Sequence, residues 1–359
     1  MPDETTFNAS AEPEADALGR LVGKLNQTFA FAGEVGRPVL GNGFFATVHD
    51  IGNGIGIAVG TDGVGTKLLV AEAMNRYDTV GIDCIAMNAN DVLCVGARPF
   101  SVVDYLAVQE VHADVMDALG KGLYEGARQA GVAIAGGELA TIPEMLQGVR
   151  PGGGFDLTAT CIGLVQTSDI IDGRAIRDGD VVIGFSSSGL HSNGYTLARK
   201  VLLTDANLPL DGYVDELGCT LGEELLKPTK IYVMPVLEAM EQTKGIAGMA
   251  HITGGGYLNI LRLRTNCGFE LTDLPAPPPI FGLIQRLGKL STEEMCRTFN
   301  MGVGYVVVAR LDAAAIVLAA AARHGFAAQV IGTAKASLKG QIVLTQLGLV
   351  GEGHGFKQQ

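Results

Sequence analysis

Hydrophobic and polar positions along this chain repeat with two different periods. Apolar residues alternate with small ones from Ile55 to Val59, which is the period-two pattern of a strand. Apolar residues between Val115 and Ala127 recur every four positions, the pattern of one helix face, and Asp114 is placed to cap that helix. Strand-like and helix-like segments alternate over most of the chain, which predicts a mixed α/β architecture.

Glycine-bearing junctions connect the predicted elements. The expected strands are 55–59, 132–135, 157–165, 181–185 and 303–309, and the expected helices are 78–96, 114–127, 195–203, a segment after 227–229, and 313–324. The 50 glycines gather in short runs between these segments, so we interpret them as tight turns and ligand-facing loops.

A length of 359 residues fits two domains. We expect a flexible acidic tail at 1–17, an N-terminal domain at 18–168, a C-terminal domain at 169–345 and a C-terminal tail at 346–359. The turn signals Asp172–Gly173 and Asp178–Gly179 indicate where the C-terminal domain begins.

Composition narrows the class of protein. A net charge of −12 argues against nucleic acid or an anionic membrane surface as the main partner. The six cysteines form no CxxC pair, and the longest apolar run, 313–322, is too short to cross a bilayer. We therefore expect a cytoplasmic enzyme that binds phosphates locally, through backbone amides, a few basic side chains and Mg²⁺.

The densest chemical signal is the segment GTDGVGTK at 60–67. It is not a Walker A loop, because its lysine follows the threonine. Asp62, two glycines, Thr66 and Lys67 at the end of a strand can hold Mg²⁺ and phosphate oxygens, and the alternative is a glycine turn with a solvated lysine.

Further acids support a metal site. Asp83 and Asn90 are seven residues apart on a predicted helix and so share a face, with Asp91 beside them. Glu138 follows a predicted buried strand and two glycines. Each acid alone is more simply a helix cap or a surface charge, whereas together they suit Mg²⁺.

The second half carries two glycine loops between a strand and a helix. Ser186–Gly194 surrounds His191 with hydroxyls and backbone amides, an arrangement suited to an anion. His251–Gly256 places three glycines where the backbone can approach a ligand closely. The alternatives are a structural histidine and a flexible turn.

Taken together, these segments resemble the phosphoribosylformylglycinamidine cyclo-ligase family of purine biosynthesis. The matching stretches are GTDGVGTKL at 60–68, DTVGIDCIAMNANDVLCVGARP at 78–99, VDYLAV at 103–108, AGGELATIPEM at 135–145, IIDGRAIRDGDVVIGFSSSGLHSNGYTLARKVL at 170–202, KPTKIYV at 227–233, HITGGGYLNILR at 251–262 and RTFNMGVGYVVV at 297–308. The resemblance extends from about residue 20 to residue 335.

The resemblance implies a two-domain PurM-like fold, with a homodimer whose N-terminal sheets form a barrel-like interface. It implies ATP-dependent closure of the imidazole ring of aminoimidazole ribotide from formylglycinamidine ribotide, with release of ADP and phosphate. The implied cofactors are ATP and Mg²⁺, and a requirement for K⁺ is left open.

The resemblance also assigns residues. The implied metal ligands are Asp62, Asp91 and Glu138, and the implied catalytic residues are Lys67, His191 and Asn193. The remaining nucleotide- and phosphate-binding positions are Gly63, Gly65, Thr66, Asp83, Asn90, Ser188, Gly189, His251, Thr253, Gly254, Gly255 and Gly256.

Three features depart from the family pattern. The N-terminal segment lacks the usual tyrosine, glycine and valine, Leu139 stands where the family has threonine, and Arg98 stands where it commonly has an acid.

Sister families fit less well: no cysteine precedes Cys84, as a selenophosphate synthetase needs, and no cysteine ends the chain, as in the hydrogenase-maturation relative. A thiamine-phosphate kinase lacks the SGLHSNGY block in this form. A degenerate nucleotide-binding homologue with a regulatory role remains the alternative from a different class.

Overall fold

The computed structural model describes residues 11–41 and 43–359, with two β-sheets that follow one another along the chain. The first sheet has six strands in the order β1-β2-β3-β6-β4-β5. Its strands are β1 (Arg37–Leu40), β2 (Thr47–Asp50), β3 (Ile55–Gly63), β4 (Arg98–Val108), β5 (Ala133–Thr141) and β6 (Phe155–Gln166). Neighbouring strands are antiparallel except β4 and β5, which are parallel and joined through helix α5 (Ala113–Ala130).

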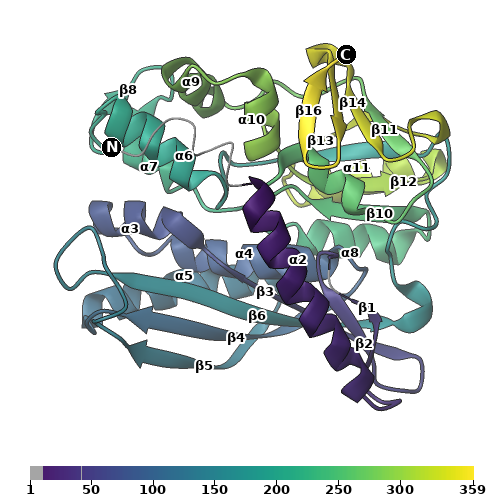
Figure 1. Cartoon of the computed structure of the whole chain (residues 1–359), viewed down its shortest axis with the longest axis horizontal. Coiled ribbons are helices and arrows are strands. Elements are labelled where there is room, and N and C mark those ends of the chain that lie inside the picture. The colour runs from purple at the N-terminus through teal and green to yellow at the C-terminus, as the bar shows by residue number, and fades with distance from the viewer. Residues whose placement is uncertain (1–10, 42) are drawn as a thin grey trace.

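Helices α4 (Val80–Leu93) and α5 cover one face of this sheet, on the side of the C-terminal domain (Figure 1). The burial pattern of β6 reflects this one-sided coverage: from Leu157 on, buried residues alternate with less buried ones, so one face of the strand is covered and the other is not. The two helices approach closely where Gly81 faces Gly122, and a Cβ on either glycine would collide with the backbone of the other helix. The short helix α3 (Leu68–Met74) follows the single turn η2 (Gly65–Lys67) at the end of β3.

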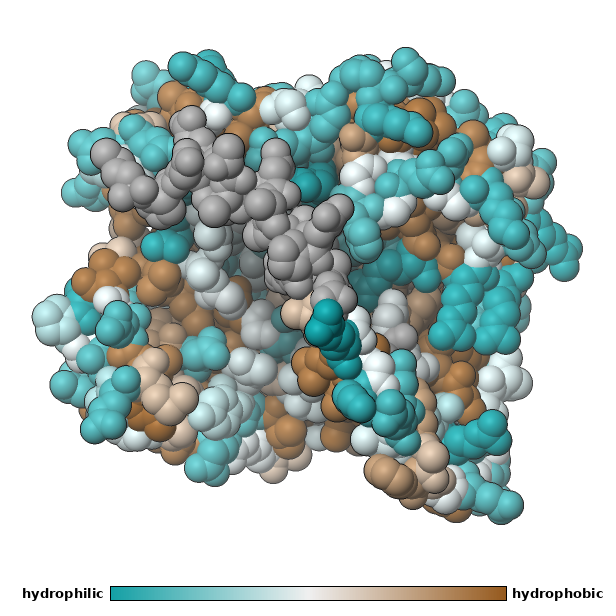
Figure 2. Space-filling model, viewed as in Figure 1, coloured by the Kyte–Doolittle hydropathy of each residue, from teal (hydrophilic) through white to brown (hydrophobic). Residues whose placement is uncertain are grey.

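The opposite face of the six-stranded sheet is open. Val103, Tyr105 and Leu164 point to it and are 38%, 42% and 46% exposed. Figure 2 shows hydrophobic side chains mixed with polar ones over the lower half of the molecule, where this sheet lies. Helix α2 (Ala11–Gln27) and the turn η1 (Thr28–Phe31) precede β1, and α2 crosses the front of the molecule diagonally (Figure 1).

The second sheet has eight strands in the order β10-β12-β7-β13-β11-β14-β15-β16. They are β7 (Val181–Ser186), β10 (Ile246–His251), β11 (Gly268–Leu271), β12 (Val303–Ala309), β13 (Ala328–Lys335), β14 (Gln341–Leu344), β15 (Leu349–Glu352) and β16 (Gly355–Gln358). Every residue of β12 is buried, which explains its unbroken apolar sequence.

The helices of the C-terminal domain are short. They are α6 (Tyr195–Arg199), which continues as a π-helical turn η4 (Lys200–Asp205), α7 (Leu221–Leu225), α8 (Val233–Gln242), α9 (Pro279–Gly288), α10 (Thr292–Thr298) and α11 (Ala314–Arg323). The 3₁₀ segments are η3 (Thr167–Asp169), the seven-residue η5 (Gly256–Arg262), η6 (Leu311–Ala313), η7 (Ala336–Leu338) and η8 (Thr345–Leu347). A short hairpin pairs β8 (Tyr213–Val214) with β9 (Cys219–Thr220).

The mixed α/β architecture predicted from the sequence is confirmed, and several predicted boundaries are wrong. The expected tail at 346–359 is instead the β15–β16 hairpin, which pairs with β14 at the edge of the sheet. The expected tail at 1–17 overlaps α2, and its first ten residues lie outside the described part of the chain. Strands β3 and β5 extend through the glycines that were expected to form loops, because ladder hydrogen bonds to β6 and β4 continue past them.

Buried polar groups join the two domains along one face of α4. Asp83 Oδ1 accepts hydrogen bonds from the Thr229 backbone N–H at 2.7 Å and from Thr229 Oγ1 at 2.6 Å. Seven residues further along α4, Asn90 Oδ1 accepts from the Tyr232 N–H at 2.9 Å, and Asn90 Nδ2 donates to the Lys230 carbonyl at 2.9 Å. The shared helix face of Asp83 and Asn90 is therefore confirmed, and its partner is the segment Lys227–Tyr232.

Lys67 completes this junction. Its side chain is fully buried, and Nζ lies 2.8 Å from Asp83 Oδ2 while donating to the carbonyls of Lys227 at 2.7 Å and His191 at 3.1 Å. One ammonium thus neutralises the buried carboxylate and binds two segments of the other domain.

Replacement of Lys67 by Met should destabilise the protein by about 3–5 kcal/mol, because Asp83 would keep its charge in a buried site without a cation. Urea unfolding followed by circular dichroism measures the effect. The double variant Lys67→Met/Asp83→Asn should recover part of the loss. The control is Lys121→Met, which breaks an exposed ion pair with Asp117 and should leave the free energy of unfolding nearly unchanged. An unfolding curve of the Lys67 variant that matches the wild type would contradict the role assigned to this lysine.

Candidate functional site

Most of the site residues predicted from the sequence lie at the junction of the two domains. Asp62 is near the end of β3, Asp91 is on α4, and the loop after β7 and the end of β10 approach them from the C-terminal domain. Residues more than 100 positions apart thus come together, as the ion pair between Asp91 and His251 shows.

Asp62 is held by its backbone rather than by its side chain. The Asp62 N–H donates to Asn88 Oδ1 at 2.8 Å, and Asn88 Nδ2 donates back to the Asp62 carbonyl at 3.0 Å. The carboxylate accepts from the Gly63 N–H at 2.8 Å. This reciprocal pairing with α4 fixes where the carboxylate lies.

The carboxylates of Asp62 and Asp91 influence each other here. Burial raises the pKa of Asp62, and the negative charge of Asp91 raises it further, while the Gly63 amide and His251 act in the opposite direction. Asp91 Oδ1 lies 2.9 Å from His251 Nδ1, and the His251 ring is completely buried. A pair of acids with this tension is the kind of donor set that a divalent cation relieves.

Lys67 does not face this pair. Its ammonium is saturated by Asp83 and two carbonyls, and burial lowers its pKa while Asp83 raises it. A direct contact of Lys67 with ATP phosphates, expected from the sequence, conflicts with this arrangement. The signal was misleading because a lysine after a glycine turn is normally exposed, whereas here the C-terminal domain covers it.

The loop Ser186–Gly194 is shaped by its own histidine. His191 has a positive φ of 62°, is 1% exposed, and accepts a hydrogen bond at Nε2 from the Ser188 N–H at 3.3 Å. Burial lowers the pKa of His191 well below its usual value, so the ring is neutral at neutral pH. Its ring packs against Gly304, where a side chain would collide with it. The predicted proton-transfer role therefore lacks solvent access, and the geometry gives His191 a structural role.

Other residues of this loop are anchored as well. Ser188 Oγ donates to the Pro228 carbonyl at 2.6 Å, and the Gly189 carbonyl accepts from Asn300 Nδ2 at 2.8 Å. Asn193 is half-buried, and its Nδ2 lies 3.9 Å from Met87 Sδ on α4. Of the predicted loop residues, Asn193 is the one whose amide stays next to the other glycine loop.

The glycine loop Thr253–Gly256 lies beside Asn193. A Cβ on Gly254 would come within 3.6 Å of Asn193 Oδ1, and one on Gly256 would overlap the Cys296 carbonyl. Gly255 and Gly256 both have positive φ, 105° and 55°. Only glycine fits at Gly256, whose N–H donates to the Thr253 carbonyl at 3.0 Å, so Gly254 and Gly255 are the loop residues whose amides suit an anion. At the end of β3, Thr66 Oγ1 lies 3.3 Å from Thr196 Oγ1, beside Gly65, whose φ is 72°.

Glu138 is in the wrong place for the predicted metal set. It lies on the exposed edge strand β5, whereas Asp62 lies on β3, with β6 and β4 between them. Its register partner is Tyr105, which points to the open face, whereas Asp62 points to the helix-covered face. Among residues 11–41 and 43–359, no three His, Cys, Asp or Glu side chains are grouped as metal ligands.

Asp104 and Asn88 lie in this site but were not among the residues predicted from the sequence. Asp104 stands on β4 in the same cross-strand row as Asp62, separated by Ala159 of β6, and burial raises its pKa. Both could have been found, since Asp104 occupies an inward position between Val102 and Leu106, and Asn88 interrupts an apolar helix.

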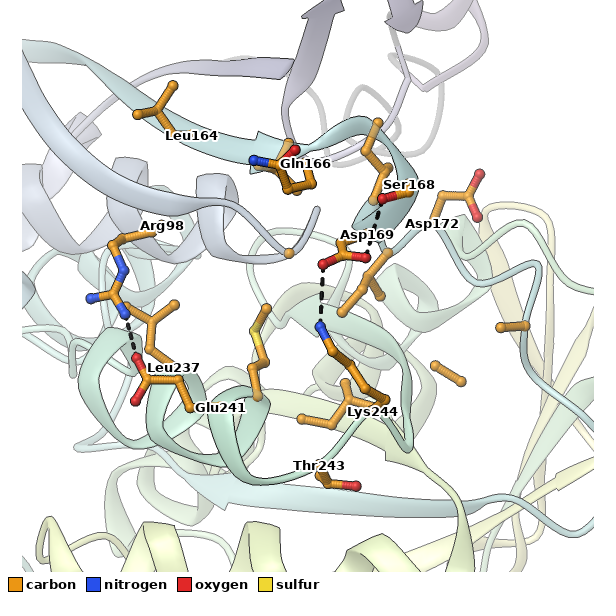
Figure 3. A pocket seen from close by; sticks show the side chains of 18 of the residues that line it. Arg98, Leu164, Gln166, Ser168, Asp169, Asp172, Leu237, Glu241, Thr243 and Lys244 are labelled. Atoms are coloured by element: carbon orange, nitrogen blue, oxygen red, sulfur yellow. Dashed lines mark hydrogen bonds and ion pairs between the residues drawn. The ribbon is translucent and has the colours of Figure 1, made fainter. Parts of the chain in front are cut away.

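A cavity of about 740 Å³ lies elsewhere, between the start of β3, the end of β6 and helix α8 (Figure 3). Arg98 Nη2 lies 2.5 Å from Glu241 Oε1, and Lys244 Nζ lies 3.2 Å from Asp169 Oδ2, so both cations in it are paired with acids. No predicted site residue lines it. Arg98, which departs from the family pattern, is thus placed in an interdomain ion pair and not beside Asp62.

Replacement of Asp62 by Asn should raise the melting temperature at pH 7 in the absence of ATP and Mg²⁺. A carboxyl whose pKa is higher in the folded state than in the unfolded state costs stability once it ionises, so the cost is absent at low pH and complete above the raised pKa. The gain should therefore shrink as the pH falls toward 4. Thermal unfolding from pH 4 to 8 measures it, with Asp211→Asn at an exposed site as the control. A variant that is less stable than the wild type at pH 7 would contradict the proposed tension.

Two family models match the chain. The N-terminal domain of AIR synthase related protein matches residues 44–165, and the C-terminal domain of AIR synthase related protein matches residues 177–345. Solved structures show the same fold at low identity. A HypE–HypF complex gives a TM-score of 0.59 at 18% identity and covers 84% of this chain and 90% of that one. T. maritima PurL complexed with ADP gives a TM-score of 0.55 at 18% identity, covering 86% of this chain and 44% of that one.

Curated relatives are much closer in sequence. A phosphoribosylformylglycinamidine cyclo-ligase of Thermococcus kodakarensis is 50% identical over 298 residues, covering 83% of this chain and 85% of the relative. One of Methanobrevibacter smithii is 44% identical over 296 residues, covering 82% of this chain and 84% of the relative. This identity, the order of the motifs and the two matching domains agree, and the chain belongs to the phosphoribosylformylglycinamidine cyclo-ligase family.

Proposed function

We propose that this protein converts formylglycinamidine ribotide and ATP into aminoimidazole ribotide, ADP and phosphate. The observation that carries the proposal is the similarity to curated cyclo-ligases, 43–50% identical over most of the chain. The junction of the two domains supports it, because it combines acids on β3 and α4 with a glycine loop on the other domain.

ATP and Mg²⁺ fit the residues at this junction. Asp62 and Asp91 form an acid pair in which one pKa is raised by burial and by the other charge. Mg²⁺ is commonly bound by one or two carboxylates together with phosphate oxygens and water, so two acids are sufficient without Glu138. Asp104, in the same row as Asp62, is the third acid on this face. When bound, Mg²⁺ would neutralise negative charge on the phosphates.

The reaction needs a poor leaving group to become a good one. The formyl amide oxygen attacks the γ-phosphorus of ATP, and the bond from that phosphorus to the β–γ bridging oxygen breaks to release ADP. The amidine nitrogen then attacks the formyl carbon, the phosphorylated oxygen leaves as phosphate, and the nitrogen loses a proton. Each step mainly needs positioning and stabilisation of negative charge.

The chain contributes fixed groups to both tasks. The Asn88–Asp62 backbone pairing holds the acid on the N-terminal domain, and Gly254 and Gly255 offer backbone amides for the substrate phosphate. Asn193 reaches between them, next to Met87 and Gly254, and is suited to hold the substrate by its amide. Lys67 and His191 act indirectly, by holding the loops that carry these groups.

A homodimer through the open face of the six-stranded sheet is also proposed. This face carries exposed Val103, Tyr105 and Leu164, and the nine-residue edge strand β5 beside it is exposed along almost its whole length. Exposed apolar faces and long free edges favour association, and a second sheet packed on this face would produce a barrel-like interface.

We also propose a cytoplasmic location. The six cysteines are all free thiols, five of them buried, which suits a reducing compartment. Among the residues that the structure describes, no helix could span a membrane.

The purified protein should form aminoimidazole ribotide from formylglycinamidine ribotide, ATP and Mg²⁺. Asp62→Asn should lower kcat/KM by about 10²–10³, because an anchor for charge on the phosphates is lost, whereas Asp211→Asn should remain active. Parallel assays in K⁺ and Na⁺ salts test the cation requirement. ATP binding by a folded wild-type protein without any product would instead favour a regulatory homologue.

Tyr105→Asp should convert the dimer into a monomer, since a charge would be placed on the apolar face of the sheet. Light scattering after size-exclusion chromatography measures the mass. The matched control is Tyr124→Asp on α5, where the side chain is 71% exposed on the other side of the sheet, and it should stay dimeric. A Tyr105 variant with the wild-type mass would place the interface elsewhere.

A further inference from the structure

Arg262 connects the C-terminal domain, which carries the glycine loop, to the N-terminal domain, and the groups that it contacts there are uncharged. It is the last residue of η5, the turn that begins at Gly256 and therefore directly follows the glycine loop. Its Nη2 donates to the Phe44 carbonyl at 2.6 Å, 218 residues earlier in the chain. Its guanidinium carbon lies 4.0 Å from the centre of the Phe45 ring. Among the described residues, no acid forms an ion pair with Arg262.

The Phe44–Phe45 segment is a firm partner. Both rings are buried, 7% and 6% exposed, and they pack edge to face with centroids 5.3 Å apart. Directly after them, Ala46 approaches Gly60 of β3, where a Cβ would lie 3.9 Å from the Ala46 methyl group, and Thr47 Oγ1 donates to the Val59 carbonyl at 3.2 Å. The segment that Arg262 contacts therefore packs on β3 close to Asp62.

The other end of η5 is tied to the glycine loop. Asn259 Nδ2 lies 3.4 Å from Thr253 Oγ1 and 3.3 Å from the Gly254 carbonyl, to both of which it donates. Residues three apart in a 3₁₀-helix lie one above the other on the same face, so Asn259 and Arg262 point the same way. One rigid turn thus binds the glycine loop with one side chain and the N-terminal domain with the other.

The charge of Arg262 affects the pKa of Cys94. Burial raises the pKa of Cys94 well above its usual value, Asp91 raises it further, and Arg262 is one of the groups that lower it. Cys94 follows α4 immediately, three residues after Asp91. The guanidinium thus acts on the C-terminal end of α4, where Cys94 lies.

We infer that Arg262 is a positioning residue that sets the separation between the substrate-phosphate loop Thr253–Gly256 and the acid-bearing strand β3. Its flat guanidinium makes a hydrogen bond to Phe44 and stacks on Phe45 at the same time, a combination that the point charge of lysine cannot reproduce. The role of this loop in holding the substrate phosphate rests on the proposed function, whereas the coupling of the two segments does not.

The coupling is tested by hydrogen exchange of the backbone amides of residues 43–46. Arg262→Met should accelerate their exchange by roughly tenfold or more, because a hydrogen bond and a cation–π contact that restrain the segment are lost. Phe45→Leu, which removes the ring face and keeps Arg262, should act in the same direction. Arg264→Met, two residues away at an exposed position, is the control and should exchange like the wild type.

The kinetic consequence is tested with the same variants. Arg262→Met should raise the KM for formylglycinamidine ribotide by roughly tenfold while changing the KM for ATP much less, and Arg262→Lys should recover only part of the loss. The double variant Arg262→Met/Phe45→Leu should cost no more than the larger single effect, because both changes break one contact.

The results separate this inference from the proposed function. Faster exchange at residues 43–46 with no product from the wild type would support the coupling and overturn the function. Product from the wild type, with unchanged exchange and an unchanged KM for the ribotide in Arg262→Met, would overturn the inference. A lower melting temperature with both readouts unchanged would also overturn it, since Arg262 would then be only structural.

Discussion

The two domains are joined by buried polar groups on one face of α4, and the candidate site exists only because of this contact. Asp83 and Asn90 satisfy the backbone of the segment Lys227–Tyr232, and Lys67 neutralises Asp83 while binding two carbonyls of the other domain. Buried charges and amides are costly unless every partner is present, so this junction forms in one relative orientation or not at all. Directional hydrogen bonds fix that orientation more tightly than an apolar interface would.

This constraint explains how charge is distributed in the site. Lys67, which the sequence suggests as a phosphate ligand, is bound within the junction, whereas Asp62 and Asp91 interact with each other and with His251. The C-terminal domain supplies backbone amides and His251 instead of lysines. The carboxylates repel one another, and backbone amides lie near them. A ligand that brings both a metal ion and phosphates would therefore stabilise this site most, since the metal ion binds carboxylates and the amides bind phosphates. The stability lost to this tension is the kind of cost that functional sites commonly carry.

The same orientation determines which surfaces remain open. Because α4 and α5 fill the space between the six-stranded sheet and the C-terminal domain (Figure 1), apolar side chains on the other face of the sheet, such as Val103 and Tyr105, stay exposed in the part of the chain that the structure describes. The cavity beside α8 is a second product of the junction, bordered by the ion pairs of Arg98 and Lys244 (Figure 3). Both features follow from how the domains meet and not from either sheet alone.

The sequence by itself determined the elements and the family. Period-two and period-four patterns located elements such as β3 and α5, because the spacing of apolar residues shows which face an element buries, and motif order identified the cyclo-ligases. It also placed Asp83 and Asn90 on one helix face, since that follows from helix geometry alone.

Tertiary structure decided the rest. Lys67 and His191 look exposed and reactive in sequence, but segments distant in the chain bury both side chains. Glu138 looks like a partner of Asp62, but strand order puts it three strands away on the opposite face. The terminal hairpin resembled a tail because its pairing partner, β14, was not evident from local pattern. In each case the deciding quantity was proximity between residues far apart in the chain, which the periodicity of a sequence does not encode.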